Sequence, residues 1–430
     1  MNAKRQMLST LVLAAILVLV LGVGTAAAQL TPKQQLGKSI FNDETISINK
    51  NQDCAVCHGP SVGWTGPDEN INQHGAVYEG SISGRFGNRK PPSSAYATPS
   101  PIFHFTRQTG GQFVGGNFWD GRATGEKLGN PAADQAQGPP LNPLEMALPD
   151  RSCVVYRVYQ DFGALYLQVW GQDLGTINWP LDMDSRCGVE TWTNPFSPED
   201  LAKIDQAYGN IALSIAAFEA SPEVNAFSSK YDLYLAGREQ LTKQEKRGLA
   251  LFNGKAKCAR CHVSQKGPKG QPPLFTDYTY DNLGVPKNPE NPFYNEPAFN
   301  PLGAAWIDLG LGGFLQSRPD YAKYAHKNMG KFKVPTLRNV DKRPFDAFVK
   351  AYGHNGYFKS LKEIVHFYNT RDVLPTCPQG MDDHGVTCWP LPELALNLNT
   401  KEVGNLGLTS EEEDAIVAFL KTLSDGYGGP

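Results

Sequence analysis

The pattern Cys-x-x-Cys-His occurs twice in this 430-residue chain, at 54–58 and again at 258–262. It is the attachment site of a c-type haem, because the two thiols bond covalently to the porphyrin vinyl groups and the adjacent imidazole ligates the iron. Zinc would need two more ligands at each site, and a thiol–disulfide site has no use for the repeated histidine. The chain is therefore expected to fold around two covalently bound haem c groups, held by Cys54, Cys57, His58, Cys258, Cys261 and His262.

Both motifs follow similar segments. The first comes after QQLGKSIFND and the second after TKQEKRGLALFNGKAK, and each segment is a polar helical turn with a glycine and then an aliphatic–phenylalanine pair. Such a repetition indicates an internal repeat of a small helical haem domain. The sequence therefore predicts two cytochrome c-like haem domains in tandem, an N-terminal one at 29–205 and a C-terminal one at 206–430.

Apolar residues recur with helical spacing in three segments, 197–221, 360–369 and 409–428. The first and the last of them begin with a serine or threonine in the capping position. Strand-like alternation is scarce, and the segments between the helices are long and rich in Pro, Gly and Asn. We therefore expect a mainly α fold with long loops wrapped on the cofactors, and a linking helix near 197–235.

The N-terminus has the three parts of a secretory signal peptide. Lys4 and Arg5 form a basic head, residues 8–23 are an apolar run, and three alanines end at Ala28. Cleavage after these alanines makes 1–28 a signal peptide and places the mature protein in the periplasm. The alternative is an uncleaved anchor, but the apolar run is short for a membrane span, so we expect none after cleavage.

The net charge limits the kinds of partner that the chain can bind, and the number of cysteines indicates disulfides. The formal net charge of −3 argues against nucleic acid as a partner. Four of the eight cysteines lie outside the haem motifs. An exported protein can keep disulfides, and proximity in the sequence predicts the pairs Cys153–Cys187 and Cys377–Cys388. Buried free thiols are the alternative for these four residues.

Ten short stretches occur together, in this order along the chain: LGKSIFND, CAVCHGP, RKPPS, NFWDGRA, QAQGPPLNPLEM, KYDLYLAG, LTKQEKRGLALF, CARCH, FKVPTLRNV and LTSEEEDAIVAFLKTLS. This set resembles the bacterial di-haem cytochrome c peroxidase family, which includes the MauG branch, and it covers nearly all of the chain beyond residue 28. The resemblance implies that the N-terminal haem is the peroxide site and the C-terminal haem is the electron-transfer site.

The resemblance also implies roles for three residues near the peroxide site. Gln135 and Glu145, ten residues apart, match the pair that lines the peroxide pocket. Splitting peroxide needs a group that takes a proton from the near oxygen and returns one to the leaving oxygen, and a carboxylate can do this while an amide holds the peroxide. A solvated loop acid is the alternative for Glu145. Trp119 matches the tryptophan between the haems and is expected to relay electrons, with core packing as its alternative.

Two further residues are placed near the haems by the resemblance. His74 lies sixteen residues after His58, where peroxidase-branch members carry a removable distal ligand of the first iron. If it does ligate, it must leave before peroxide can bind; an ordinary loop histidine is the alternative. Arg338 matches a basic residue near the haems and is expected to contribute to cofactor binding.

The sixth ligand of the second haem iron separates the branches of the family. Typical peroxidases use methionine, which raises the haem potential, whereas the MauG branch uses tyrosine. The position fourteen residues after His354 holds Tyr368, which is the expected ligand. Met329 is the alternative by location, His366 is a further contender, and core packing is the remaining reading of Tyr368. A tyrosinate would favour storing oxidising equivalents on both irons.

Two stretches depart from the family pattern, in which a calcium ion often lies between the haems. Lys90 in RKPPS stands in the place of an asparagine that helps to bind this calcium, and the usual APYFH reads KAYGH from Lys350 to His354. Calcium is therefore doubtful, although backbone carbonyls can still bind it.

We therefore expect a periplasmic di-haem peroxidase that reduces hydrogen peroxide to water with electrons from a small c-type cytochrome or another soluble donor. The first alternative is a MauG-like oxidase, which uses the same chemistry to oxidise a partner protein or an organic substrate. The second is a non-catalytic di-haem electron carrier, which would leave Glu145 without a role. Family members are often dimers, so the resemblance also implies a homodimer.

Overall fold

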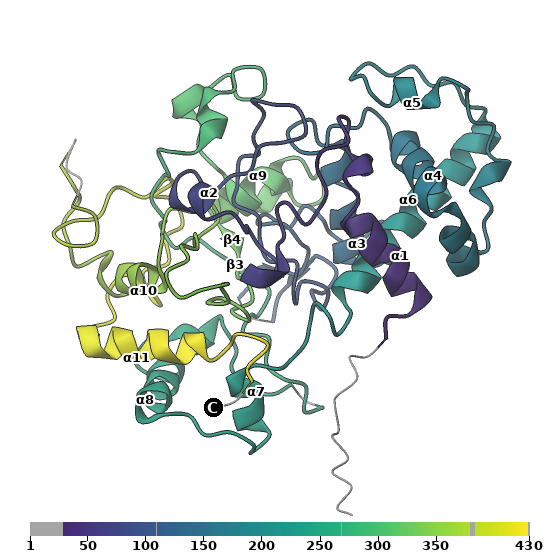
Figure 1. Ribbon diagram of the computed structural model, residues 1–430. Helices are drawn as coiled ribbons and strands as arrows, with labels where there is room; N and C mark the ends of the chain where they lie inside the picture. Colours follow the sequence, from purple (N-terminus) through teal and green to yellow (C-terminus); the bar gives the residue numbers. More distant parts are fainter. Residues whose placement is uncertain (1–28, 109, 268, 379–382, 429–430) are drawn as a thin grey trace, which may run out of the picture.

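The computed structural model describes residues 29–108, 110–267, 269–378 and 383–428. Within these ranges the chain is mainly helical, as expected (Figure 1). The helices are α1 (Pro32–Phe41), α2 (Glu69–Gln73), α3 (Pro131–Ala136), α4 (Arg151–Trp170), α5 (Met183–Arg186), α6 (Pro198–Glu219), α7 (Lys230–Leu235), α8 (Lys243–Asn253), α9 (Gly310–Gln316), α10 (Leu361–Thr370) and α11 (Ser410–Lys421). None of these described helices is long and apolar enough to cross a membrane. The expected signal peptide lies outside the described residues.

The strands are short and form two small antiparallel pairs. β1 (His104–Thr106) pairs with β2 (Gln112–Val114), and β3 (Tyr280–Asp281) pairs with β4 (Phe332–Lys333). A two-stranded ribbon cannot form a core by itself, so the helices and the packed loops must supply it.

One hydrophobic core lies among α1, α3, α4 and α6, which Figure 1 shows together on one side of the molecule. The backbones of α1 and α6 meet at Gly37, where an added Cβ atom would lie 1.9 Å from the carbonyl oxygen of Ser214. Only glycine allows so close an approach. α1 ends at Phe41, whose ring packs in this core against Trp64 and Phe218.

A second core lies among α8, α10 and α11. α8 and α11 run side by side (Figure 1), and a Cβ atom on Gly248 would lie 1.9 Å from the carbonyl oxygen of Ala415. Phe252, near the end of α8, packs against Phe275 and Phe419. The helices that precede the two haem motifs, α1 and α8, thus each approach a second helix at a glycine and place a phenylalanine in the core.

The helix starts agree with the expected caps. Ser197 accepts a hydrogen bond from the backbone N–H of Asp200 at the start of α6. Thr409 and Glu412 form a reciprocal capping box at the start of α11. The third expected helix is α10, which begins after Ser360. α4, with 20 residues, was not expected from the sequence.

The expected linking helix at 197–235 is wrong in its extent, because two helices, α6 and α7, replace it. Pro222 explains the break between them, since proline has no N–H to donate and disfavours a helical conformation in the residue before it. The expected domain boundary at 205 falls inside α6, and residues on both sides of that point belong to the first core.

The long loops are themselves packed around a third core. It joins the strands β1 and β2 to α9 and to the segment that follows α9. Phe113 stacks on Phe103, with ring centroids 5.2 Å apart, and meets the edge of Tyr321 at 5.1 Å. The aromatic residues of these loops are therefore part of the folded interior.

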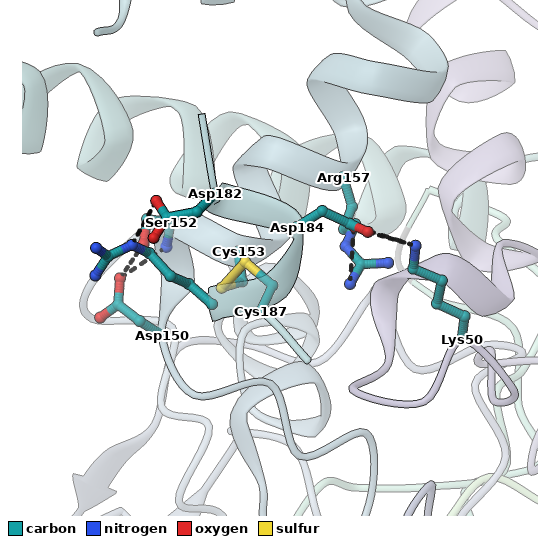
Figure 2. Close-up of a disulfide and its surroundings, with 9 residues drawn as sticks. Lys50, Asp150, Ser152, Cys153, Arg157, Asp182, Asp184 and Cys187 are labelled. Atoms are coloured by element: carbon teal, nitrogen blue, oxygen red, sulfur yellow. Dashed lines mark hydrogen bonds and ion pairs between the residues drawn. A yellow bond between two sulfur atoms is a disulfide. The ribbon is translucent and has the colours of Figure 1, made fainter. Parts of the chain in front are cut away.

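Both expected disulfides are present, and they join Cys153 to Cys187 and Cys377 to Cys388. The first connects α4 to the residue after α5 (Figure 2). Beside it, Asp184 of α5 lies between Lys50 and Arg157, at 3.1 Å and 3.5 Å from their side-chain nitrogens. The disulfide and these ion pairs together attach α5 to α4 and to the loop before the first haem motif.

Candidate functional site

The first Cys-x-x-Cys-His motif forms a tight turn that is hydrogen-bonded to the end of α1. The N–H of Cys54 donates to the carbonyl of Phe41 at 3.1 Å, and the N–H of His58 donates to the carbonyl of Cys54 at 3.0 Å. Cys54 and Cys57 are free thiols, and both line a cavity together with His58. The core position of Phe41 therefore determines where the motif opens into this cavity.

The ring of His58 is held in one orientation. Its Nδ1 donates to the carbonyl of Trp64 at 3.2 Å, which leaves Nε2 as the unprotonated nitrogen. Burial lowers the pKa of His58 to about 4, so the imidazole is neutral at neutral pH. A neutral imidazole with its other nitrogen hydrogen-bonded to a carbonyl is the usual arrangement of a metal-binding histidine.

Gln135 and Glu145 line the same cavity as His58. Gln135 lies on α3, and Glu145 lies in the loop that follows this helix. The side-chain amide of Asn142 donates to Oε1 of Glu145 at 3.0 Å. Burial raises the pKa of Glu145, and it outweighs the opposing effects of Arg122 and of the bond from Asn142.

The backbone of Glu145 is also fixed. Its carbonyl accepts from the N–H of Ser81 at 2.7 Å. The neighbouring Gly80 makes this contact possible, since a Cβ atom there would lie 2.5 Å from the carbonyl oxygen of Leu144. The carboxyl group therefore reaches the cavity from a docked loop, which differs from the solvated loop acid considered above.

The second motif has the same construction. His262 donates from Nδ1 to the carbonyl of Phe275 at 2.8 Å, and burial lowers its pKa to about 4. Cys258 and Cys261 are free thiols that line a second cavity with this histidine. The second imidazole is thus also neutral, with Nε2 available.

Tyr368 lies on α10 and lines the second cavity together with His262. In the described part of the chain, the lining of this cavity contains neither Met329 nor His366. Met329 lies in the third core, and Nδ1 of His366 lies 2.8 Å from a carboxylate oxygen of Glu413. Of the three contenders for the sixth ligand, Tyr368 is the one that faces the cavity.

Trp119 lies in the wall that the two cavities share, and Lys90 and Pro92 also line both. The indole N–H of Trp119 donates to the carbonyl of Lys90 at 2.8 Å. The carbonyl of Trp119 accepts from the N–H of Lys333 at 2.8 Å. The indole is therefore held rigidly between the two cavities.

His74 lies away from the first cavity. It follows α2, is exposed, and is not among the described residues that line the cavity of His58. Its Nδ1 is 2.7 Å from the carbonyl of Asn70, and its own carbonyl accepts from Nζ of Lys359 at 2.6 Å. The structure therefore does not bring His74 and His58 together, and distal ligation would require this segment to leave these contacts.

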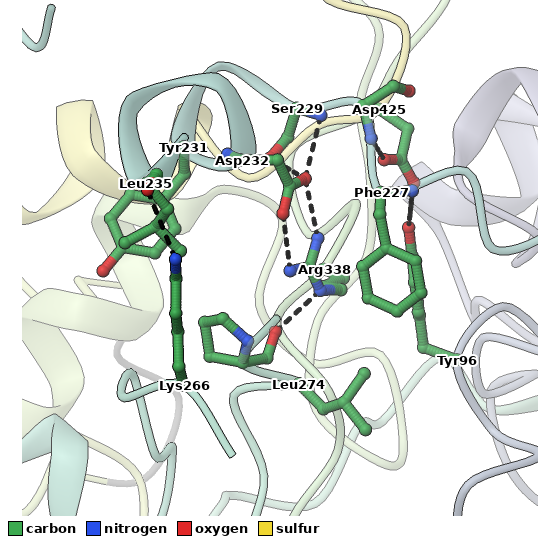
Figure 3. Close-up of polar contacts among 12 residues, drawn as sticks. Tyr96, Phe227, Ser229, Tyr231, Asp232, Leu235, Lys266, Leu274, Arg338 and Asp425 are labelled. Carbon is green, nitrogen blue, oxygen red and sulfur yellow. Dashed lines mark hydrogen bonds and ion pairs between the residues drawn. The ribbon is translucent and has the colours of Figure 1, made fainter. Parts of the chain in front are cut away.

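Arg338 lines the second cavity, but its guanidinium is bound by protein groups (Figure 3). Two of its nitrogens donate to the carboxylate of Asp232 at 2.9 Å and 3.0 Å, and Nε donates to the carbonyl of Pro273 at 2.7 Å. The same carboxylate accepts from Ser229 at the start of α7. Arg338 thus joins α7 to the cavity wall.

Glu219 is a cavity residue that the sequence did not bring to attention. It is the last residue of α6, and its side chain lines the first cavity. Burial raises its pKa to about 8. Its position in the sequence could have indicated it, because Glu219 comes four residues after Ile215 and so lies on the apolar face of α6. A glutamate on such a face is rarely buried without a function.

Each cavity offers the three groups that a c-type haem uses. Two free thiols and one imidazole with an available Nε2 line each of them, whereas the other four cysteines are in disulfides. This donor set fits covalent attachment through the thiols and iron ligation through the imidazole.

Comparisons with known proteins agree with this arrangement. The sequence model of the family described as di-haem cytochrome c peroxidase matches residues 31–240. The methylamine utilization protein MauG of Paracoccus denitrificans (strain Pd 1222) is 34% identical over 427 residues, which cover 97% of this chain and 96% of that protein. The cytochrome-c peroxidase IdrP1 of Denitromonas iodatirespirans is 25% identical, over 91% of this chain and 81% of its own length.

A solved structure has the same overall arrangement. The diheme peroxidase BthA of Burkholderia thailandensis E264 superposes with a TM-score of 0.70 at 27% sequence identity. The match covers 93% of this chain and 87% of that one. The likeness therefore extends over both cavities and not over one haem motif alone.

Proposed function

This chain belongs to the di-haem cytochrome c peroxidase family, and from that premise we propose that it is an exported enzyme that reduces hydrogen peroxide to water. Family membership implies two haem cofactors. We propose that they are attached covalently through the two cysteine pairs and ligated by His58 and His262. The tandem division into two haem domains belongs to the same proposal, with the linker placed after α6.

The observation that carries the proposal is the position of Glu145, a half-buried carboxyl group that lines the cavity of His58. Reducing one peroxide to two waters consumes two protons and two electrons, and the bound haem supplies the redox-active iron. Glu145 takes the proton from the near oxygen and returns it to the leaving oxygen. Gln135 holds the peroxide, and Asn142 keeps the carboxyl group turned toward it.

Replacing Glu145 with Gln tests this role, because the amide has the same shape and cannot exchange a proton. We expect peroxide turnover to fall by ~10²-fold or more, with haem content unchanged. The matched control is Glu199→Gln on the exposed start of α6, which should turn over as the wild type does. Equal turnover of Glu145→Gln and wild type would refute the role.

The pH profile is a second readout of the same variant. Since the pKa of Glu145 is raised, the wild type should lose activity on acidification at a higher pH than an ordinary carboxyl group would cause. The carboxylate is the active form, so the loss occurs as pH falls through the raised pKa. Glu145→Gln should lack this acidic limb.

A second candidate is a MauG-like oxidase, in which the electrons come from a partner protein or an organic substrate. Two observations favour it over a peroxidase that must be reduced by one electron before it reacts with peroxide. Tyr368 faces the second cavity, where a tyrosinate ligand would stabilise higher oxidation states, and His74 does not cover the first one. The 34% identity with a protein named MauG points the same way.

Mixing the fully oxidised protein with peroxide, without any donor, separates the two candidates. A MauG-like oxidase should give a high-spin signal at rest and a long-lived product after peroxide. A peroxidase gated by His74 should respond only after one-electron reduction. No response in any state would leave the electron carrier as the function.

The electron donor of the peroxidase candidate is proposed to be a small c-type cytochrome or another soluble donor, met in the periplasm. We also propose a homodimer, which light scattering of the haem-loaded protein would test. A monomer at micromolar concentration would contradict that assembly.

A further inference from the structure

Two lysines lie buried at the wall of the haem cavities. Lys350 is 4% exposed and lines the second cavity, and Lys90 is 7% exposed and lines both. Lysine is almost never fully buried unless its charge is compensated. Their positions therefore require an explanation that the reaction with peroxide does not supply.

The ammonium group of Lys350 is enclosed by three backbone carbonyls. Its Nζ donates to Val62 at 2.8 Å, to Lys342 at 2.9 Å and to Asn339 at 3.1 Å. A protonated amine has three N–H donors and no acceptor, so it satisfies all three oxygens. A neutral amine would leave one carbonyl facing a lone pair. The cage therefore fits the charged form.

Lys90 is tied to both cavities through its backbone and its side chain. Its Nζ donates to the hydroxyl of Thr65 at 2.7 Å and to the carbonyl of Pro91 at 3.0 Å. Its backbone N–H donates to His354, and its carbonyl accepts from the indole of Trp119. One of the three ammonium donors of Lys90 thus remains for a group in the cavities.

Neither ammonium group forms an ion pair with a carboxylate in the part of the chain that the structure describes. Burial lowers the pKa of both lysines, to about 8 for Lys90, and the charge of Lys90 lowers that of Lys350 further. Two neighbouring buried cations need negative charge nearby. Each haem carries two carboxylates, and a haem bound in these cavities would bring that negative charge to the protein.

The residues present do not fit a calcium ion between the haems. Lys90 stands where the family has a calcium-binding asparagine, and it offers no oxygen ligand. The second departure from the family pattern, KAYGH, begins with the other buried lysine, Lys350. Its ammonium group already uses the three carbonyls, which are the kind of oxygen donors that calcium prefers. Two fixed positive charges would also repel a divalent cation.

We propose that Lys350 and Lys90 are built-in cations that replace the calcium ion between the haems. They supply fixed positive charge to the haem carboxylates and to both irons, so this protein holds its haem pair together and sets its potentials without a bound metal ion. The inference rests on the binding of two haems and not on which substrate is oxidised.

Metal analysis of the haem-loaded wild type is the first test. After gel filtration in EDTA, calcium should be far below one ion per two haems, and neither EDTA nor added calcium should change the absorption spectrum or the haem potentials. One calcium per chain, or a spectral change with EDTA that calcium reverses, would overturn the proposal.

Spectroelectrochemistry of lysine variants is the second test. Removing a positive charge favours the ferric state, so Lys350→Met should lower the potential of the haem ligated by His262 more than that of the other haem. Lys90→Met should lower both, because Lys90 lines both cavities. The control is Lys327→Met, which removes the same charge from an exposed position.

A shift in Lys350→Met and Lys90→Met no larger than in the control would refute the proposed charge effect. If Lys350→Met does not fold, Lys90→Met and the metal analysis of the wild type still decide the question. Neither readout depends on peroxide turnover, so a failure of the proposed function would be seen separately.

Discussion

At the scale of single residues, hydrogen bonds fix the histidine of each cavity in the same way, and the other lining residues make the cavities different. His58 and His262 both donate from Nδ1 to a backbone carbonyl, so both keep Nε2 available as a metal ligand. The cavities differ in what faces these imidazoles. Glu145, Glu219 and the amide of Gln135 line the first, whereas the phenol of Tyr368 lines the second, together with carboxyl groups such as those of Asp281 and Glu402. Our proposal places the peroxide reaction in the first cavity, where Gln135 and Glu145 lie, and electron storage in the second.

The sixth ligand of the second iron can be tested at this scale. Tyr368→Phe removes the only ligating atom of that side chain, so we expect the electron paramagnetic resonance and absorption of the second haem to change. Met329→Leu is the control, and it should leave both spectra as in the wild type because Met329 lies in the third core. A change in Met329→Leu alone would assign the ligand to methionine.

The ion pair between Arg338 and Asp232 belongs to stability rather than to catalysis. Arg338 is fully buried, and its guanidinium outweighs burial to lower the pKa of Asp232. Arg338→Met leaves that carboxylate buried and unpaired, so we expect the free energy of unfolding to fall by ~3–5 kcal/mol in denaturant titrations.

The control for Arg338→Met is an exposed ion pair. Arg260→Met, which removes the surface pair with Glu402, should change the free energy of unfolding by about 1 kcal/mol or less. Equal effects of the two variants would contradict the role of the buried pair. The contribution of Asp232 should vanish on acidification, as pH falls through its lowered pKa and the carboxylate is protonated.

At the scale of elements, two helix pairs place the haem motifs. α1 packs on α6 and α8 packs on α11, each through one glycine, and a phenylalanine at or near the end of α1 and of α8 packs in the core beside the motif. The motif turns themselves contain few buried groups. Their positions are thus set by the helix that precedes them.

Adding one methyl group at these contacts tests that dependence. In Gly37→Ala and Gly248→Ala the new Cβ would lie 1.9 Å from a backbone oxygen, so one helix must shift. We expect a loss of ~1–3 kcal/mol in stability, measured by thermal unfolding, and weaker haem incorporation at the motif that follows the changed helix. Gly428→Ala is the control, since a Cβ there would meet nothing within 4 Å. Unchanged stability of both helix variants would contradict the packing described.

At the scale of the whole molecule, the two cavities share one wall. Trp119 lies in this wall and is fixed by Lys90 and Lys333. Trp119→Phe should slow the redistribution of oxidising equivalents between the haems by about tenfold, or ~1.4 kcal/mol in barrier, because phenylalanine is harder to oxidise. Stopped-flow spectra of the second haem after peroxide would measure it.

The control for Trp119→Phe is a tryptophan away from the wall. Trp170 ends α4 and lines neither cavity among the described residues, so Trp170→Phe should behave as the wild type. A Trp119→Phe protein that equilibrates as fast as this control would show that the relay does not use the indole.

Much of the site could be predicted from local patterns. The motif residues, the caps at Ser197 and Thr409 and both disulfides follow from short-range sequence, and the structure confirms the caps and the disulfides. The spacing of apolar residues predicts one linking helix, and Pro222 divides it into α6 and α7. α4 was missed, although it is one of the longest helices in the described chain.

Other features depend on which distant segments meet. Glu219 and Glu145 enter one cavity from different elements, and the carbonyl of the distant Val62 joins those of Asn339 and Lys342 around Lys350. No spacing rule indicates these contacts, because they arise from the packing of α6 and of the long loops.

The sequence by itself determined the local part of this protein: two Cys-x-x-Cys-His motifs, the helical segments that precede them and the helix caps at Ser197 and Thr409. These features depend on residues that are neighbours in the chain, so they can be predicted without knowledge of the fold. The tertiary structure alone decided what lines each cavity, which carbonyls fix the two imidazoles and what lies between the cavities. It turned His74 away from the first cavity, turned Tyr368 toward the second and buried two lysines in their walls, because burial and hydrogen bonding act between segments that only folding brings together.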